Sequence, residues 1–472
     1  MLKYFAILLT FIQFACGTEV RTNVLFIAID DLNDRGIPGL HPEVKTPNID
    51  RLAAMGTSFT KAYCAAPACN PSRASVITGI HPATSGVYFN QQEWKKNPVL
   101  RDVPTIPHHF REEGYTTLGG GKIYHAASLS EAGFCGLLDP DPWDVFYPSK
   151  ERQLAPEVLP SIVPTNGNSK FYRGFFDWAL LQIADKEMGD AKVVHWATGE
   201  LSKTHSKPLF LAVGIYRPHI PWYTPQKYFD LYPIDDISLP EVIEDDFDDI
   251  PESGQEMARR HWHKWIADEG KWKAAIQGYL ASVTFADAMV GQLLDALEKG
   301  PLADNTAIVL WSDHGYHLGH KEHWKKFALW EQATHVPLIF AAPGLPKGQE
   351  CHHPVSLLDV YPTLIELTGT TSRPRLDGTS LVPWLRDHDK ESNRAILTTQ
   401  GYKNHAVRSA DFRYIRYADG GEELYDHRKD PNEFTNLARN PEYQSTIESH
   451  KLWLPEKDAE LNPPNTQKKK SK

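Results

Sequence analysis

The chain has 472 residues and a formal net charge of −10 at pH 7. This length is sufficient for a large buried core and two or three structural lobes. A hydrophobic fraction of 41% excludes a disordered or collagen-like chain. The negative net charge argues against a broad nucleic-acid-binding surface, so we expect no nucleic-acid partner and a local cluster of cations wherever an anion binds.

The first residues follow the pattern of a signal peptide. Lys3 precedes an apolar run over residues 4–14, which is too short to span a bilayer, and small residues follow. We therefore expect a signal peptide at residues 1–17 and export to the periplasm or the medium, without a transmembrane segment. The alternative is a membrane-anchored lipoprotein with Cys16 as the lipid acceptor, although Gln13 stands where a branched aliphatic residue is expected.

Apolar β-rich runs alternate with helical stretches, which favours an α/β fold. Buried strands are predicted at residues 23–29, 208–215, 307–311 and 336–341, with a long helix at 273–297. This pattern predicts a catalytic domain over residues 18–390, in which helices cover a large mixed or parallel sheet.

The pattern of predicted elements changes near residue 391. Short aromatic strands are predicted at residues 395–399, 406–408 and 414–417, and they indicate a small α+β subdomain over residues 391–472. The acidic stretch at residues 244–249 lacks the spaced pattern of a calcium-binding loop, so we expect a solvated loop or insertion there.

The most informative segment is CNPSRASVITG at residues 69–79. Pro71 suits the first turn of a helix and Gly79 its end, which would place Cys69 at the helix amino terminus. Free N–H groups and the helix dipole favour an anion there, and Arg73 lies one turn further on. The alternative reading of this segment alone is a buried cysteine beside a capped helix.

This segment resembles the signature of type I sulfatases, CxPSR followed by TG, in which the cysteine is oxidised to formylglycine. Other family motifs occur in the expected order: TPNIDRL at 46–52, SDHG at 312–315, ELYD at 423–426 and DP at 430–431. The resemblance covers essentially the whole mature chain. It is greatest to the iduronate-2-sulfatase-like branch, through GKIYH at 121–125, AVG at 212–214, PHIP at 218–221 and THVPLI at 334–339. It implies an alkaline-phosphatase-like fold.

The resemblance also implies a metal site. Asp30, Asp31, Asp313 and His314 match the family's metal ligands, together with residue 69, and each pair follows a predicted strand and can meet at one sheet edge. Carboxylate oxygens favour a hard cation, which is calcium by resemblance and magnesium as the alternative. His314 stands where many relatives have an amide, so the identity of the metal stays open.

Further catalytic roles follow from the resemblance. Lys122 and Lys326 match lysines that hold the sulfate oxygens, with Lys325 as an adjacent alternative to Lys326. His219 matches the acid that protonates the departing sugar oxygen, and His125 the base that assists release of sulfate. In this implied mechanism the hydrated formylglycine attacks sulfur, and Arg73 stabilises the hydrate.

Two residues, Arg217 and His405, are candidate substrate contacts from their neighbourhood alone. The histidines at 317, 320 and 323 suggest a zinc cluster, but Gly319 interrupts a helical face, so surface or substrate-cleft histidines are expected. Core packing is expected for the thiol of Cys64 and for four aromatic residues, with stacking on sugar rings as the alternative for the aromatics, which are Trp222, Tyr223, Tyr316 and Trp324.

The sequence therefore predicts an exported hydrolase of sulfate monoesters on carbohydrates, which needs an enzyme that generates formylglycine as its maturation partner. Uronate, rhamnose and galactose polymers are the candidate sugars. The alternatives are an arylsulfatase, a phosphate- or phosphonate-ester hydrolase on the same scaffold, and a catalytically silent carbohydrate-binding homologue.

Overall fold

The computed structural model describes residues 21–34, 43–125, 128–130, 133–135, 137–163, 165–168, 170 and 176–461, with residues 128–130 and 133–135 described as backbone. The predicted signal peptide, including Cys16, lies outside the described residues.

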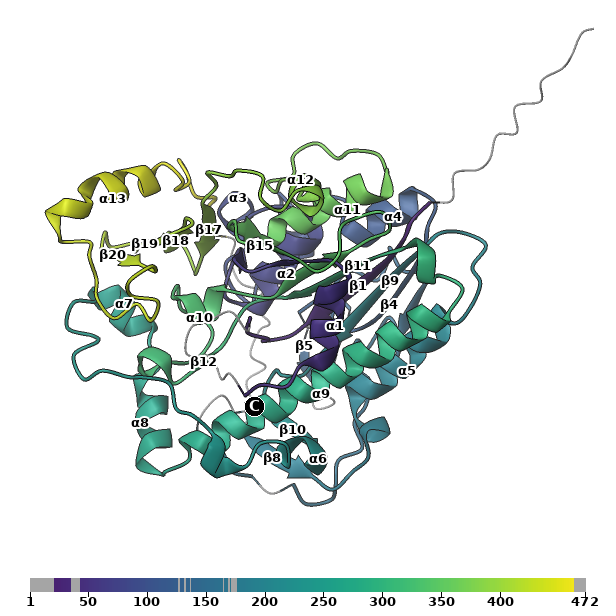
Figure 1. The fold of residues 1–472 in the computed structure, drawn as a ribbon, viewed down its shortest axis with the longest axis horizontal. Helices are drawn as coiled ribbons and strands as arrows, with labels where there is room; N and C mark the ends of the chain where they lie inside the picture. The colour runs from purple at the N-terminus through teal and green to yellow at the C-terminus, as the bar shows by residue number, and fades with distance from the viewer. Residues whose placement is uncertain are drawn as a thin grey trace, which may run out of the picture.

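An eight-stranded sheet forms the centre of the molecule (Figure 1). Within it, both pairings of β14 are antiparallel and the other pairings are parallel, which confirms the predicted large mixed sheet covered by helices. The bounds predicted for the strand at residues 23–29 are confirmed, whereas those of the other three predicted strands are wrong by one or two residues. In spatial order the strands are β15 (Gln349–Cys351), β2 (Thr57–Phe59), β14 (Leu338–Ala341), β11 (Thr306–Ser312), β1 (Asn23–Ile29), β9 (Leu209–Ile215), β4 (Thr116–Gly121) and β7 (Val145–Tyr147).

The helices cover both faces of this sheet (Figure 1). Helices α1, α5 and α9 pack on one face, and α2, α4 and α11 on the other. The helices are α1 (Pro47–Met55), α2 (Cys69–Thr78), α3 (Pro82–Ser85), α4 (Ile106–Glu112), α5 (Gly189–Leu201), α6 (Gln226–Phe229), α7 (Glu252–Met257), α8 (Arg260–Asp268), α9 (Trp272–Lys299), α10 (Glu331–Thr334), α11 (Val360–Thr368), α12 (Val382–Arg386) and α13 (Gln444–Lys451).

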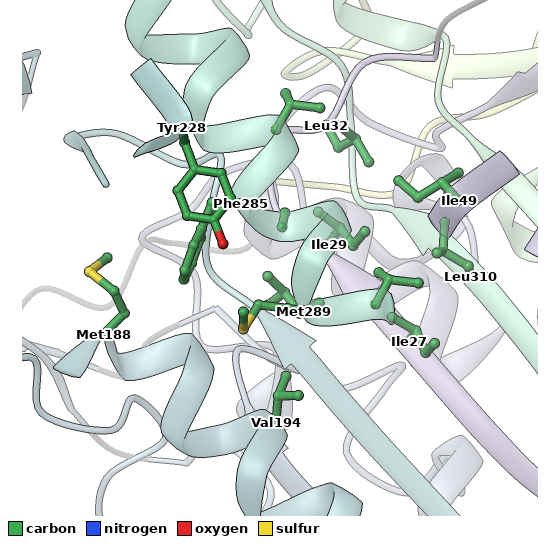
Figure 2. Packing of buried hydrophobic residues seen from close by; sticks show 14 of the residues in the cluster. Ile27, Ile29, Leu32, Ile49, Met188, Val194, Tyr228, Phe285, Met289 and Leu310 are labelled. Atoms are coloured by element: carbon green, nitrogen blue, oxygen red, sulfur yellow. The ribbon is translucent and has the colours of Figure 1, made fainter. Parts of the chain in front are cut away.

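Alternation along β1 explains why the sheet is covered on both sides. Ile27 and Ile29 belong to the core cluster with α9, where Figure 2 shows them near Met289, whereas Phe26 and Ala28 belong to the cluster with α2. Successive side chains of a strand point to opposite faces, so a continuous apolar run is buried by two layers of helices.

Helix α9 is the longest helix of the described chain. By length and composition alone it could cross a membrane, but 78% of its most apolar window is buried inside the protein. Met289, Leu293 and Leu297 contribute to the core cluster beneath the sheet, so α9 packs as a core helix.

Among the described residues, four two-stranded sheets accompany the large sheet, and the C-terminal segment contains a separate antiparallel sheet in the order β17-β18-β19-β20 (Figure 1). Its last strand, β20, is absent from the strands predicted from the sequence. The bounds are β3 (Ala62–Tyr63) with β16 (Val355–Ser356), β5 (Ser128–Ser130) with β6 (Gly133–Cys135), β8 (Trp178–Leu181) with β10 (Trp222–Pro225), β12 (His317–Leu318) with β13 (Trp324–Lys325), and β17 (Ile396–Thr399), β18 (His405–Arg408), β19 (Phe412–Arg416) and β20 (Glu422–Asp426).

The sequence predicts a solvated loop at residues 244–249, but part of this acidic stretch is buried. Asp246 is 1% exposed and accepts a hydrogen bond from Lys321 Nζ at 2.6 Å. Phe247 is buried in the cluster of apolar residues beside the C-terminal sheet. The prediction fails at Asp246 because its cationic partner lies far away in the sequence.

Buried ion pairs join the C-terminal sheet to α10. Glu331 pairs with Arg413 and, at 3.3 Å, with Arg408, and all three side chains are at most 5% exposed. Arg413 also pairs with Glu433 at 2.7 Å, and His427 contacts the same carboxylate at 2.9 Å. Burial opposes ionisation of Glu331, but Arg408 and Arg413 outweigh it and hold the pKa of its carboxyl well below the usual value.

Glu331→Gln is expected to lower the free energy of unfolding by about 3 kcal/mol at pH 7, because it removes the carboxylate that pairs with Arg408 and one of the two carboxylates that pair with Arg413. Since the folded-state pKa of Glu331 is depressed, its contribution is complete above about pH 4.5 and is lost as the pH falls further. The difference between wild type and variant should therefore shrink from pH 5 to pH 3 in urea unfolding.

A matched control is Glu448→Gln, which removes an exposed carboxylate paired with Lys451. We expect this change to alter stability by less than about 0.5 kcal/mol. A difference between Glu331→Gln and wild type that stays constant with pH would contradict the ion-pair explanation.

Candidate active site

The predicted site residues follow four adjacent strands of the large sheet. Asp30 follows β1, Asp313 follows β11, Lys122 follows β4, and His219 lies four residues after the end of β9. These strands are parallel and adjacent, in the order β11-β1-β9-β4. Their carboxyl ends therefore deliver the side chains to one edge of the sheet, as expected for an α/β protein.

Cys69 is the first residue of α2, with Ala68 in the extended N-cap position. Pro71 occupies the first turn, and Gly79 ends the helix with a left-handed φ of 72°. The helix boundaries thus confirm what Pro71 and Gly79 predict, and they place Cys69 at the amino terminus of α2.

The backbone of Asp31 explains how two consecutive aspartates reach the same centre. Asp30 directly follows β1, and Asp31 has a left-handed φ of 60°. Consecutive residues of a regular strand would point to opposite faces. The unusual backbone at Asp31 turns its carboxylate back toward the site, where local strain is common in enzymes.

The thiol of Cys69 lies among cations. Its Sγ is 3.1 Å from Lys326 Nζ and 3.3 Å from His314 Nε2, and His125 also hydrogen-bonds to it. Burial opposes the thiolate, but Lys326, Lys122 and His314 outweigh burial and lower the pKa of Cys69 well below its ordinary value. The position therefore stabilises negative charge, which is what a reacting anion needs.

Arg73 joins the helix to both strand ends. Its guanidinium donates to Asp313 Oδ2 at 2.8 Å and to Asp30 Oδ1 at 3.2 Å, and it also bonds the carbonyl of Lys122. Burial disfavours its charge, but Asp313 and Asp30 raise the pKa of Arg73 above its ordinary value. Arg73 is therefore a permanent cation that fixes α2 against the sheet edge.

Two buried lysines complete the cationic side of the site. Lys122 pairs with Asp30, and Lys326 Nζ donates to Asp31 Oδ1 at 2.5 Å. Burial disfavours both charges, but Asp30 raises the pKa of Lys122, and Asp31 with Cys69 raises that of Lys326. Both lysines therefore carry a positive charge at neutral pH.

The residues at the centre fit a divalent cation. Asp30, Cys69, Asp313 and His314 each offer a ligand atom, and these four atoms lie within 4.8 Å of one another. Asp31 Oδ2 is buried without a hydrogen-bond partner, which suits coordination of a cation. Three carboxylates favour a hard cation such as calcium, while His314 adds a nitrogen donor.

The histidines at 219 and 125 approach the same centre. His219 Nδ1 donates to the carbonyl of Ile220 at 2.6 Å, and a ring nitrogen of His219 lies within 4.8 Å of ligand atoms of Asp31 and Cys69. Burial and then Lys122 lower the pKa of His219. His125 is half-buried, which makes it more exposed than the other residues of the cluster.

Arg217 and His405, the two candidate substrate contacts, are engaged elsewhere. Arg217 is buried and pairs with Glu157 at 3.1 Å. His405 contacts Asp458 at 3.1 Å and Thr399 Oγ1 at 2.9 Å. Among the described residues, neither has a hydrogen bond or ion pair with Cys69 or the three aspartates.

The histidines at 317, 320 and 323 are at most 4% exposed, so a surface location is wrong. His317 and His323 donate hydrogen bonds to the backbone carbonyls of His320 and Lys326 in the same loop. The predicted packing role holds for the aromatic residues Trp222, Tyr316 and Trp324, which are fully buried, and for Cys64. Tyr223 is half-buried.

Two supporting residues had no predicted role. Ser72 Oγ donates to the carbonyl of Asp313 at 2.5 Å, and Tyr279 OH donates to the carbonyl of Asp31 at 3.0 Å. Both hold the backbone of residues that could ligate a cation. Ser72 is part of the CxPSR motif and could have been noticed there, whereas Tyr279 sits inside the apolar helix α9 with no distinguishing signal.

Comparison with known proteins agrees with this geometry. The family model described as Sulfatase matches residues 22–370, and the model described as N-sulphoglucosamine sulphohydrolase, C-terminal, matches residues 319–459.

Two relatives and one solved structure illustrate the likeness. A sulfatase of Formosa agariphila is 40% identical over 97% of this chain and 92% of its own, and human iduronate 2-sulfatase is 30% identical over 79% and 75%. A phosphonate monoester hydrolase structure from Silicibacter pomeroyi shares the fold, with a TM-score of 0.75 at 22% identity over 92% of this chain and 94% of its own. With the cluster around Cys69, these matches show that the chain belongs to the sulfatase family, enzymes that hydrolyse sulfate esters.

Proposed function

We propose that this protein is an exported carbohydrate sulfatase, which uses a formylglycine formed from Cys69 to release inorganic sulfate from sulfated poly- or oligosaccharides. The observation that carries the proposal is the placement of Cys69 Sγ at a helix amino terminus, 3.1 Å from Lys326 Nζ and beside three carboxylates. This arrangement places the side chain of residue 69 next to both a positively charged lysine and negatively charged carboxylates.

A bound divalent cation, held by Asp30, Asp31, Asp313 and His314, would supply Lewis-acid charge next to residue 69. One hydroxyl of a hydrated formylglycine at that residue would serve as the nucleophile, and the second would give up its proton as sulfate is expelled and the aldehyde re-forms. Arg73 contacts Asp30 and Asp313 together, so it holds the ligands in place and adds positive charge beside the nucleophile.

Lys122 and Lys326 would bind the oxygens of the sulfate group. Both ammonium groups are buried and positively charged, and their donors converge on the cluster around Cys69. Fixed positive charge that faces the sulfuryl oxygens stabilises the transition state more than the ground state, and such electrostatic stabilisation is commonly the largest catalytic contribution.

His219 and His125 would carry out the proton transfers. His219 would protonate the departing sugar oxygen through Nε2, since its Nδ1 is held by the carbonyl of Ile220. Burial and Lys122 lower its pKa, and the negative charge of a bound sulfate ester would favour its protonated form. His125, which hydrogen-bonds to residue 69, is placed to take a proton as sulfate leaves.

The carbohydrate assignment is supported by relatives, since human iduronate 2-sulfatase is named for a sulfated sugar acid and matches 79% of this chain. Export is supported by the order of residues 1–17, in which a lysine is followed by an apolar run and then by small residues.

The substrate class can be tested with a panel of sulfated uronate, rhamnose and galactose oligosaccharides, alongside 4-nitrophenyl sulfate and its phosphate and phosphonate counterparts. We expect release of inorganic sulfate from at least one oligosaccharide with a kcat/KM that is at least about tenfold higher than for the aryl sulfate. Ion chromatography of the products measures this directly.

A preference for 4-nitrophenyl sulfate would contradict the carbohydrate assignment and favour an arylsulfatase. A preference for the phosphate or phosphonate esters would contradict the sulfatase reaction itself.

A further inference from the structure

Lys326 lies in the most unusual backbone of the described chain. Five residues of the loop 319–327 have left-handed φ angles, namely Gly319, Lys321, Glu322, Lys325 and Phe327. Non-glycine residues adopt this conformation only where surrounding contacts impose it. The loop therefore needs specific internal contacts to present Lys326 to Asp31 and Cys69.

His323 supplies such a contact from inside the loop. Its Nδ1 accepts a hydrogen bond from the backbone N–H of Arg259 at 2.8 Å, so the ring proton resides on Nε2. Nε2 donates to the carbonyl of Lys326 at 3.0 Å. One fully buried imidazole thus ties the backbone of Lys326 to the segment that leads into α8.

The residue after Lys326 is fixed as well. Phe327 N–H donates to the carbonyl of Pro67 at 3.0 Å, two residues before Cys69. The backbone of Lys326 is therefore held between a contact to His323 and a contact to the segment that carries Cys69. A small rotation of this short segment would move the Lys326 ammonium group away from its partners.

We propose that His323 is a positioning residue, which sets the location of Lys326 by a hydrogen bond to its carbonyl and acts on the reaction through that lysine. This inference rests on the proposed role of Lys326 in binding sulfate. His323 has no acid–base role, because burial and Arg259 lower its pKa to about 3, and the imidazole stays neutral in the working range.

Three substitutions separate the two hydrogen bonds. His323→Phe removes both, and His323→Gln keeps an N–H donor at about the reach of Nε2. His323→Asn keeps an acceptor near the position of Nδ1, but its side chain is too short to reach the carbonyl of Lys326. Each variant is prepared in the matured, calcium-loaded form. The assays measure 4-nitrophenyl sulfate hydrolysis, the inhibition constant of inorganic sulfate, and thermal unfolding.

We expect His323→Phe to lower kcat/KM about 10- to 100-fold, because misplacement of a catalytic group by about 1 Å has effects of this size. The inhibition constant of inorganic sulfate should rise in parallel. His323→Gln should recover most of both losses and His323→Asn should not, while the shape of the pH profile stays unchanged in all three.

His109→Phe is the matched control, since His109 is also fully buried and has two side-chain hydrogen bonds, to Thr370 and from Arg373. It should lower Tm without changing the inhibition constant of sulfate. Equal behaviour of His323→Gln and His323→Asn, or a loss in His323→Phe no greater than in the control, would overturn the proposal. So would the disappearance of one limb of the pH profile.

Lys326→Ala distinguishes an error in the proposed function of Lys326 from an error in the proposed positioning role of His323. If this variant keeps wild-type activity and sulfate inhibition, the proposed function of Lys326 is wrong. If it loses both while His323→Phe does not, the function of Lys326 stands and the positioning role of His323 is rejected.

Discussion

Cys69→Ala is expected to lower hydrolysis of sulfate esters by at least about 10³-fold, as the loss of a covalent nucleophile does in other hydrolases. The protein should remain folded, because alanine fits the helical start of α2 and removes one sulfur atom from the cluster. Inorganic sulfate release and circular dichroism, measured on the same preparation, test the two parts of this expectation.

Cys64→Ala is the matched control for this experiment. Cys64 is also fully buried but contacts the carbonyl of Ala333, and burial raises the pKa of its thiol. We expect a loss of stability of about 1 kcal/mol and nearly unchanged activity. Substantial activity in Cys69→Ala would contradict the assignment of the nucleophile.

Mass spectrometry of the wild-type peptide that contains residue 69 adds a direct check. Conversion of the thiol to the aldehyde lowers the peptide mass by about 18 Da. An unmodified thiol in protein from the native host, together with absent hydrolysis, would favour a carbohydrate-binding homologue without catalysis.

Removal of divalent cations with a chelator is expected to abolish activity and lower Tm by several degrees, and calcium should restore both. Asp30, Asp31 and Asp313 place three carboxylates in a buried site, where a cation relieves their mutual repulsion. A ligand that binds only the folded state at 100 times its Kd adds about 2.7 kcal/mol to stability. Thermal unfolding with and without calcium measures this directly.

Asp31→Asn should greatly reduce the calcium-dependent rise in Tm, because it removes the charge of a carboxylate that has one unsatisfied oxygen. Asp287→Asn is the control, since Asp287 is also buried but accepts hydrogen bonds from the start of α1. Its calcium-dependent rise should equal that of wild type. A rise in Tm that survives in Asp31→Asn would exclude this site as the source, and restoration by magnesium but not calcium would reassign the cation.

The location of the site could be predicted from local sequence patterns. The apolar run of β1 ends at Asp30, and Pro71 and Gly79 delimit α2, so strand ends and the helix start follow from neighbouring residues alone. Such patterns record backbone preference and burial, which depend on residues close in the chain. The resemblance in the CxPSR segment then associated these positions with one reaction.

Tertiary structure decided which distant partners each side chain meets. Asp246 lies in an acidic run that reads as solvated, yet Lys321 neutralises it in the interior, and His323 turns inward to hold Lys326. Tyr279 has the pattern of a core residue, yet its hydroxyl supports Asp31. These contacts join residues that are far apart in the sequence or lie within an irregular loop. Their geometry depends on how whole elements pack, because neither a hydrogen bond nor an ion pair has a periodic signature in the chain.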